Sequence, residues 1–336
     1  MRAFEIEAFG LERLRRVERA PPRPSATQML VRVGAASLNF RDLLMIGGDY
    51  NPKQPLPLIP GSDGVGEVVD VGAQVSRFKK GDRVITSFFQ AWESGEATRQ
   101  KLLSTLGGPI DGTFAEMMLV EEQGAVLAPA YLSDEEAATL PCAALTAWNA
   151  LVHQGAIRAG ETVLVQGTGG VSLFALQFAR MHGARVIVTS SSDEKLQRAK
   201  ELGAWACINY KSTPDWSKIA REITGGNGVD HIVEVGGAAT LEQSIRCVRH
   251  GGVISLIGIL SGVATPVLLT PLLMQSIRIQ GVYVGPRELF EEMNKALEVN
   301  NLHPVVDKVF AFDELPTALA RMKQAAHFGK IVVRMR

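Results

Sequence analysis

A glycine-rich turn between an apolar run and a helical segment is the feature that most constrains this fold. Residues 162–166 form a short apolar run typical of a buried parallel strand. The turn Gly167-Thr168-Gly169-Gly170-Val171-Ser172 follows, a GxGxxG pattern with serine in the third glycine position. Gly167 permits the tight turn, Gly169 lets the backbone approach a pyrophosphate, and the small Ser172 fits where helix meets strand. This context predicts a dinucleotide whose phosphates lie at the helix N-terminus; the alternative is a glycine turn that binds nothing.

The residues around this turn alternate between strand and helix patterns. Further strands are expected at residues 185–189, 206–209, 229–235 and 253–257, and helices at 170–182 and 193–202. Alternation at this spacing predicts an α/β fold with a doubly wound parallel sheet of the Rossmann type.

The first third of the chain has a different pattern of apolar and turn-forming residues. Short β-branched runs such as 30–33, 66–72 and 81–85 are punctuated by glycine and proline, which favours a barrel-like β domain. We therefore expect the first part of a catalytic domain at residues 1–130, a Rossmann domain at 131–285, and the C-terminal part of the catalytic domain at 286–336. The return of this last segment, with a helix at 288–298 and a strand at 329–333, rests partly on the family resemblance given below.

Composition excludes several classes of partner and location. The 336 residues contain 35 Lys plus Arg and 35 Asp plus Glu, so nothing favours nucleic acid or an anionic membrane. No window reaches the roughly 20 apolar residues that span a bilayer, and residues 1–14 do not resemble a secretory signal. Three widely spaced cysteines, Cys142, Cys207 and Cys247, form no disulfide framework. A cytoplasmic location is expected.

The end of the second strand of the parallel sheet bears on the choice of cofactor. NAD enzymes usually place a carboxylate about 20 residues after the glycines to bind the ribose hydroxyls. Here the strand ends in Ser190-Ser191-Ser192, whose hydroxyls could donate to a 2′-phosphate, and Lys195 is near enough to neutralise it. Lys195 could instead be a solvated helix lysine, and Asp193 and Glu194 weaken the argument. The residues favour NADP over NAD.

Several short motifs, in one order along nearly the whole chain, resemble the medium-chain dehydrogenase/reductase superfamily. The resemblance is strongest to its zinc-independent, quinone-oxidoreductase-type members. It implies a GroES-like β-barrel domain paired with the Rossmann domain, a nicotinamide bound between them, and a homodimer or homotetramer often joined through the strand at 277–284. The motifs are the glycine turn together with residues 38–42, 60–66, 81–84, 141–148 and 328–333.

The same resemblance implies positions around the cofactor. NADPH-using relatives have lysine at the position of Lys195 and a tyrosine, here Tyr210, near the 2′-phosphate, which strengthens the expectation of NADP. Lys330 is expected to reach the cofactor. For the hydrophobic positions the alternative is plain core packing. The residues expected to line the nicotinamide, ribose and carboxamide are Thr146, Val235, Ile257, Gly258, Ile259, Val282 and Val284.

The catalytic zinc of alcohol dehydrogenases in this superfamily has no matching ligands here. By resemblance, its Cys, His and Cys ligands fall at Asn39, Ser62 and Cys142, and only the last is retained. A catalytic zinc needs about three nitrogen, sulfur or carboxylate ligands, and Asp63 with Cys142 supplies two. The four-cysteine structural lobe is also missing, because residues 86–120 contain no cysteine. We expect no metal.

Without zinc, the enzyme needs hydrogen-bond donors for developing negative charge, or a substrate that already accepts hydride well. Quinones, enones and enoyl thioesters fit that description. Asp42 is as consistent with a structural acceptor as with a catalyst. Aromatic side chains at 88, 89 and 92 could wall an apolar pocket or simply pack their loop. The polar residues expected at the catalytic site are Asn39, Arg41, Tyr50 and Asp63.

Three functions remain open. The first is NADPH-dependent reduction of an activated C=C bond or quinone, which residues 38–42 support by their resemblance to enoyl reductase domains. The second is an alcohol dehydrogenase or carbonyl reductase acting on small alcohols, aldehydes or ketones. The third is a non-enzymatic NADPH-binding structural or RNA-binding protein, which the zero net charge disfavours as far as RNA is concerned.

Overall fold

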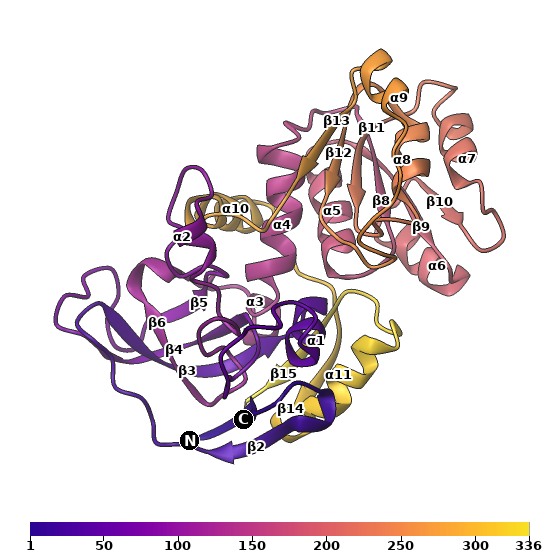
Figure 1. The fold of residues 1–336 in the computed structure, drawn as a ribbon. Helices are drawn as coiled ribbons and strands as arrows, with labels where there is room; N and C mark the ends of the chain where they lie inside the picture. Colours follow the sequence, from indigo (N-terminus) through magenta and orange to yellow (C-terminus); the bar gives the residue numbers. More distant parts are fainter. Residues whose placement is uncertain (336) are drawn as a thin grey trace. The chain divides into compact units, whose positions relative to one another are not determined.

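The computed structural model describes residues 1–335, which divide into two compact units (Figure 1). One unit combines Met1–Leu145 with the chain from Val284 onward, and the other is Thr146–Tyr283. The discontinuous unit is called the barrel unit below, and Thr146–Tyr283 is called the nucleotide unit.

The nucleotide unit is built on a six-stranded parallel sheet. Every neighbouring pair in it is parallel, and the chain reverses direction across the sheet between β8 and β11. In such sheets ligands bind outside the carboxyl ends of the strands at this switch point. The predicted Rossmann sheet is confirmed. In spatial order its strands are β10 (Ala206–Asn209), β9 (Arg185–Ser190), β8 (Thr162–Gln166), β11 (Val229–Glu234), β12 (Val248–Leu256) and β13 (Arg278–Gly281).

Helices connect these strands and bury their apolar faces on the sheet. Leu164, Ile187 and Ile232 from the strands share one hydrophobic cluster with Trp216 of α7 and Ile245 of α8. The sequence analysis located α5 and α6 to within one residue at each end but predicted neither α7 nor α8, whose patterns are short. The helices are α5 (Gly170–Met181), α6 (Asp193–Glu201), α7 (Trp216–Ile223), α8 (Leu241–Cys247) and α9 (Leu269–Met274).

The barrel unit contains a seven-stranded sheet and a separate strand pair, β1 (Arg2–Ile6) with β2 (Leu14–Glu18). The C-terminal strand β15 pairs antiparallel with β3, so the last part of the chain lies inside this sheet, between β14 and β3. In spatial order the strands are β14 (Val306–Ala311), β15 (Lys330–Arg334), β3 (Gln28–Ser37), β4 (Asp63–Val71), β5 (Arg83–Thr86) and β7 (Ala125–Leu127), with β6 (Met117–Glu121) also on β3.

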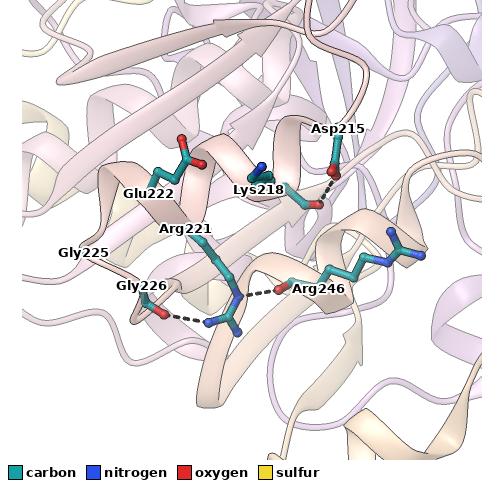
Figure 2. A pocket seen from close by; sticks show the side chains of 8 residues that line it. Asp215, Lys218, Arg221, Glu222, Gly225, Gly226 and Arg246 are labelled. Carbon is teal, nitrogen blue, oxygen red and sulfur yellow. Dashed lines mark hydrogen bonds between the residues drawn. The ribbon is translucent and has the colours of Figure 1, made fainter.

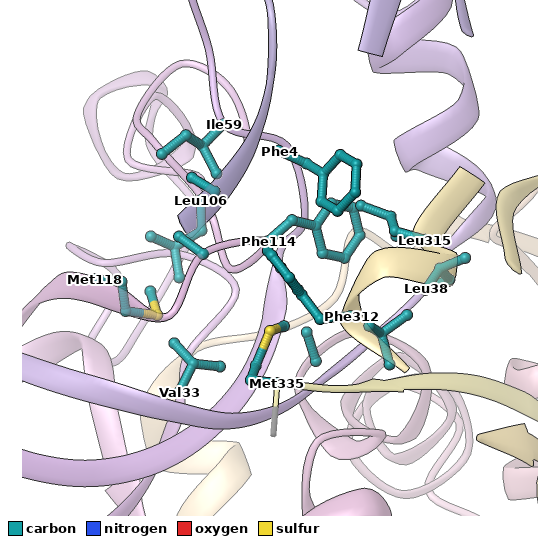
Figure 3. Packing of buried hydrophobic residues seen from close by; sticks show 14 of the residues in the cluster. Phe4, Val33, Leu38, Ile59, Leu106, Phe114, Met118, Phe312, Leu315 and Met335 are labelled. Carbon is teal, nitrogen blue, oxygen red and sulfur yellow. The ribbon is translucent and has the colours of Figure 1, made fainter. Parts of the chain in front are cut away.

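The core of the barrel unit joins residues from both ends of the chain (Figure 3). Phe4 meets Phe312 edge to face, with ring centroids 5.0 Å apart, and Phe114 and Leu315 belong to the same buried cluster. Burying aromatic rings in this way stabilises the return of the C-terminal segment. The helices of this unit are α1 (Phe40–Gly47), α2 (Arg99–Leu102), α3 (Asp134–Ala137), α10 (Arg287–Val299) and α11 (Leu315–Lys323).

The unit boundary differs from the predicted domain boundary at residue 131. Residues 131–145 lie with the barrel unit, whereas the sequence analysis assigned them to the Rossmann domain. Polar contacts explain the difference, because Asp134 pairs with Arg83 at 2.7 Å and Glu135 pairs with Arg334 at 2.6 Å. A helical segment then continues through π-helical turns at Leu140–Ala144, α4 (Leu145–Trp148) and further π-helical turns at Asn149–His153.

Among residues 1–335, no helix combines the length and the hydropathy needed to cross a bilayer.

Candidate active site

The glycine turn has the backbone geometry that a dinucleotide site requires. Gly167 adopts a φ of +72°, and a Cβ built there would meet nothing within 4 Å. Its N–H donates to Thr189 O at 2.7 Å, which fixes the turn against β9. The first N–H groups of a helix have no intrahelical acceptor, so those at the start of α5 are available to phosphate oxygens. The residues of this turn therefore fit the diphosphate of a nicotinamide dinucleotide.

Ser172, in the third glycine position, ties α5 to the end of β8. It is buried, and its hydroxyl donates to Gln166 O at 2.6 Å. The sequence analysis required only a small side chain here, but the structure adds a hydrogen bond that a glycine could not make.

A buried network that the sequence analysis missed shapes the loop after β11. The Gln166 side chain donates to Glu234 Oε2 at 2.6 Å, and the other Glu234 oxygen accepts from the N–H groups of Gly236 and Gly237 and from the Thr240 hydroxyl. A fully satisfied buried network of this kind holds one loop conformation. The signal for it was a carboxylate at the end of an apolar strand, with two glycines following after one further residue, Val235.

Predicted cofactor-lining residues lie on this loop and the next. Val235 and Ile257 are half-buried and Ile259 is half-exposed, directly beyond the carboxyl ends of β11 and β12. A Cβ at Gly258 would lie 2.3 Å from Val235 O, so glycine is what lets the two loops approach. Thr146 is buried within the same unit.

Strand β13 is shorter than the apolar run predicted at 277–284. Val282 still follows the sheet, since its N–H donates to Leu256 O at 3.0 Å. Val284 adopts a φ of +53°, a strained conformation for a β-branched residue, which marks the point where the chain leaves the sheet. Both valines are buried.

The residues predicted for the 2′-phosphate gather at the ends of β9 and β10. Ser190 lies opposite Asn209 in the parallel register, and the Tyr210 N–H donates to Ser190 O at 3.1 Å. Tyr210 is 42% exposed, so its ring can reach a ligand. The Ser192 hydroxyl accepts the Lys195 N–H at 3.3 Å and thereby starts α6.

Two carboxylates lie on the first turn of α6, close to these residues. Asp193 accepts a hydrogen bond from the Asn209 side chain at 2.7 Å, and Glu194 is exposed on the same first turn of α6. Ser191 is half-buried beside Ser190.

A second, separate group of polar residues is buried in the barrel unit around Asp63. Its carboxylate accepts from the Ser62 hydroxyl at 2.8 Å, the Ser37 hydroxyl at 3.3 Å and the Cys142 N–H at 3.3 Å. Lys330 Nζ lies 3.6 Å from the same carboxylate. Asp63 is fully buried, and these contacts compensate for its lost hydration. We call this group, with Asn39, the Asp63 cluster.

Asn39 and Lys330 complete the Asp63 cluster. The Lys330 ammonium donates to Asn39 Oδ1 at 2.6 Å and to Leu38 O at 2.7 Å, and Asn39 Nδ2 donates to Ser62 Oγ at 3.3 Å. Lys330 is 3% exposed and bonded within the barrel unit, and its contact with the cofactor stays a prediction.

Asp42 lies beside the cluster at the start of α1. Its Oδ2 accepts the Asn39 N–H at 2.7 Å, and its Oδ1 is buried without a hydrogen bond. Burial raises the pKa of Asp42 to about 7, although the Asn39 N–H and the Arg41 charge lower it. Burial therefore favours the protonated form of this carboxyl.

Arg41 makes several contacts within the barrel unit. Its guanidinium donates to Leu106 O at 3.1 Å and Gly108 O at 2.6 Å, and it lies 4.9 Å from the Tyr50 ring centroid and 5.2 Å from that of Phe88. It holds the loop at 106–108 against α1. Tyr50 itself is 39% exposed, whereas Phe88, Phe89 and Trp92 are buried, which favours a loop-packing role for these three.

The donors at the three positions aligned with zinc ligands do not fit a zinc ion. In the structure the Asn39 amide contacts the Ser62 hydroxyl, and the Cys142 N–H donates to the Asp63 carboxylate. The three positions therefore lie close together. The site is filled by an amide, a hydroxyl and the Lys330 ammonium, and burial raises the pKa of the Cys142 thiol well above its ordinary value. Nowhere in residues 1–335 do three or more His, Cys, Asp or Glu side chains form a group that could hold a metal.

An open hollow on α7 and α8 contains none of the predicted site residues (Figure 2). At its base the Arg221 guanidinium donates to the carbonyls of Gly226, Arg246 and Val248 at 2.6–3.2 Å. These bonds satisfy carbonyls at the ends of two helices, so the arginine has a structural role.

Comparisons with known proteins agree with both units. Residues 25–130 match the family model described as the alcohol dehydrogenase GroES-like domain, and residues 170–299 match that of the zinc-binding dehydrogenases. A zinc-type alcohol dehydrogenase-like protein of Schizosaccharomyces pombe is 45% identical over 98% of this chain and 97% of its own. A quinone oxidoreductase of Sus scrofa is 30% identical over 95% of this chain and 92% of its own.

A solved structure of an NAD-dependent alcohol dehydrogenase superposes over 100% of both chains, with a TM-score of 0.93 and 34% identity. The predicted combination of a GroES-like domain and a Rossmann sheet is thereby confirmed, and so is the predicted class of enzyme. The chain belongs to the medium-chain dehydrogenase/reductase superfamily of NAD(P)-dependent oxidoreductases.

Proposed function

We propose that this enzyme is an NADPH-dependent reductase that works without a catalytic zinc and transfers a hydride to a quinone or an activated C=C bond. The observation that carries the proposal is the Asp63 cluster, in which a lysine ammonium lies among positions that match zinc ligands in relatives. The bound nicotinamide would supply the hydride, and the chain would orient the two reactants.

The preference for NADPH is supported by the ends of β9 and β10. Ser190, the exposed Tyr210 and Lys195 at the start of α6 lie on neighbouring elements, with no acidic side chain at the carboxyl end of β9. Hydroxyl and ammonium groups would bind a 2′-phosphate, whereas an NAD site usually has a carboxylate there. The NAD-dependent relative makes the comparison of both cofactors necessary.

The choice of acceptor follows from the absence of suitable zinc ligands in the cluster. A simple ketone or aldehyde needs strong polarisation of its carbonyl, which zinc supplies in a metal-dependent site. A quinone or enone accepts hydride more readily and needs only hydrogen-bond donors for its developing charge. The alternative, a carbonyl reductase acting through such donors alone, is kept because an alcohol dehydrogenase-like relative shares 45% of its residues with this chain.

Fluorescence titration with NADPH and NADH, with zinc assayed on the same sample, tests the proposal. We expect NADPH to bind at least tenfold more tightly than NADH, Lys195→Ala to lose that preference, and Lys200→Ala on the same helix to keep it. Equal affinities would contradict the 2′-phosphate site, and stoichiometric zinc that supports turnover would contradict the metal-free mechanism.

A panel of quinones, enones, aldehydes and ketones, assayed by NADPH oxidation, then separates the functions. Turnover confined to quinones and enones supports the proposal, and preferential turnover of aldehydes or ketones supports the carbonyl reductase. Tight NADPH binding with no turnover of any acceptor would favour the non-enzymatic function.

A second copy of this chain is the partner that we propose for the nucleotide unit. Strand β13 ends the parallel sheet with one edge unpaired by any strand of residues 1–335, and Leu268, Leu269, Leu273 and Met274 near it are each at least 71% exposed. An open edge beside exposed apolar side chains is typical of an interface. Light scattering should show a dimer or tetramer that Leu273→Lys with Met274→Lys weakens; a monomeric wild type would contradict this.

A further inference from the structure

Lys330 and Asn39 face each other because of the register between β15 and β3. Val332 pairs with Ser37, and the Leu38 N–H donates to Ile331 O at 2.9 Å. Just before the strand, Gly329 adopts a φ of +92°, and a Cβ there would lie 2.3 Å from Val305 O. The backbone therefore determines where the lysine side chain begins, at the first residue of the strand.

The Lys330 ammonium has two hydrogen-bond acceptors and one ion-pair partner. It donates to Leu38 O at 2.7 Å and to Asn39 Oδ1 at 2.6 Å, and it lies 3.6 Å from Asp63 Oδ2. An ammonium group has three donors and no acceptor. With these three partners around its ammonium and a side chain that is 3% exposed, Lys330 is placed to act on its neighbours.

The orientation of the Asn39 amide follows from these neighbours. Ser62 has one hydroxyl proton, which it donates to Asp63 Oδ1 at 2.8 Å, so toward Asn39 its oxygen is an acceptor. Asn39 must therefore present its NH2 group to Ser62 and its oxygen to the ammonium of Lys330. The opposite orientation would place two donors against each other.

One N–H of the Asn39 amide remains available. Nδ2 carries two protons, one is given to Ser62 Oγ, and no other acceptor for Nδ2 occurs within residues 1–335. Asn39 is 8% exposed, compared with 0% for Asp63 and 3% for Lys330, so the residue that carries this N–H is less completely buried than these two partners.

We infer that Lys330 is a positioning residue, which fixes the Asn39 amide so that its remaining N–H donates to the carbonyl oxygen of the bound hydride acceptor. This role rests on the proposed function, since it needs an acceptor whose oxygen gains charge as hydride arrives. A preoriented neutral donor stabilises that charge without reorganising during the reaction.

A double-mutant cycle tests whether Lys330 acts through Asn39. We expect Lys330→Met and Asn39→Ala each to lower kcat/KM for the acceptor about 10- to 100-fold, with the dissociation constant of NADPH unchanged within threefold. The double variant should be no worse than either single variant within about twofold, because the lysine has nothing to position once the amide is gone. Lys323→Met, an exposed lysine on α11, is the matched control.

If the loss of kcat/KM in the double variant equals the product of the two single losses, the inference is overturned, because Lys330 would then act independently of Asn39. A loss confined to NADPH binding would overturn it as well.

Nuclear magnetic resonance of the Asn39 side chain gives a second readout that needs no turnover. In asparagine-labelled protein, the signal missing from Asn39→Ala identifies the amide. We expect the amide proton that Ser62 accepts to be protected from solvent exchange in the wild type. In Lys330→Met, both amide protons should shift and that protection should be lost. An unchanged amide signal would overturn the inference. If the wild type reduces no acceptor, the proposed function fails, while this signal still decides whether Lys330 positions Asn39.

Removal of the ammonium alone leaves Asp63 as a buried charge, so Lys330→Met could fail to fold. In that event, Lys330→Met with Asp63→Asn removes both charges, and Asp63→Asn alone is its reference. We expect the Asn39 amide to be protected from exchange in Asp63→Asn and unprotected when Lys330→Met is added. Equal protection in these two proteins would overturn the inference.

Discussion

The glycine turn of the nucleotide unit and the Asp63 cluster of the barrel unit are polar sites built in opposite ways. At the turn, the donors are backbone N–H groups that the fold leaves without intrahelical acceptors. In the cluster, the donors and acceptors are side chains that largely satisfy one another. A site for a charged ligand leaves hydrogen-bond donors without acceptors in the protein, so that the ligand can bind them. A buried cluster bonds its donors and acceptors to one another, which fixes a single geometry. Substitutions at the two sites should therefore have different consequences.

The largest loss of stability is expected in the cluster. Asp63→Leu removes the acceptor for Ser37, Ser62 and the Cys142 N–H and leaves Lys330 buried without its carboxylate. Breaking a buried pair costs about 3–5 kcal/mol. The midpoint of chemical denaturation should fall accordingly, and Asp63→Leu with Lys330→Met should recover part of the loss. A loss below about 1 kcal/mol in Asp63→Leu would show that the cluster does not hold its unit together.

The pH dependence of stability should also come from the cluster side. Burial raises the pKa of Asp42 from 3.8 to about 7, so the protonated carboxyl is the form that the fold favours. Its contribution is fully present below pH 3.8 and is lost as the pH rises through about 7. Asp42→Asn retains an acceptor for the Asn39 N–H and cannot ionise. Its advantage in thermal unfolding temperature over the wild type should grow between pH 4 and pH 8; an advantage that stays constant would contradict the raised pKa.

The two sites also differ in how far the sequence revealed them. Strand β8, its turn and α5 were predictable because their signal is local: an apolar run, glycines at fixed spacing and a helical period. The Asp63 cluster joins residues 37–39, 62–63, 142 and 330, which only the sheet register brings together. The resemblance to zinc enzymes indicated three of these positions but not the Lys330 ammonium among them. Residues 131–145 lie with the barrel unit and not, as predicted, with the Rossmann domain. The ion pairs to Arg83 and Arg334 that hold them there have no signature in the local sequence.

Two alanine substitutions in the nucleotide unit test whether the close approach of the loops after β11 and β12 is needed for cofactor binding. A Cβ at Gly258 would lie 2.3 Å from Val235 O, whereas one at Gly281 would meet nothing within 4 Å. Gly258→Ala should force the 257–262 loop away from Val235, cost about 1–3 kcal/mol and weaken NADPH binding about tenfold. Gly281→Ala should leave both unchanged. If the two variants behave alike in thermal unfolding and fluorescence titration, the close approach of these loops is not part of the cofactor site.

A second pair of glycines should lose little stability on substitution by alanine, and the two should differ in cofactor binding. Gly167 and Gly160 both have positive φ angles, +72° and +88°, and neither has any atom within 4 Å of a built Cβ. Alanine at either position should therefore cost about 1–2 kcal/mol of backbone strain and no more. Gly167 lies on the turn before α5, whereas Gly160 lies before β8. The open space above Gly167 is where we place the diphosphate, so Gly167→Ala should weaken NADPH binding at least tenfold and Gly160→Ala should not. Equal dissociation constants for the two variants would mean that this space is not where the phosphates bind, and the N-terminus of α5 would lose its role as the anion site.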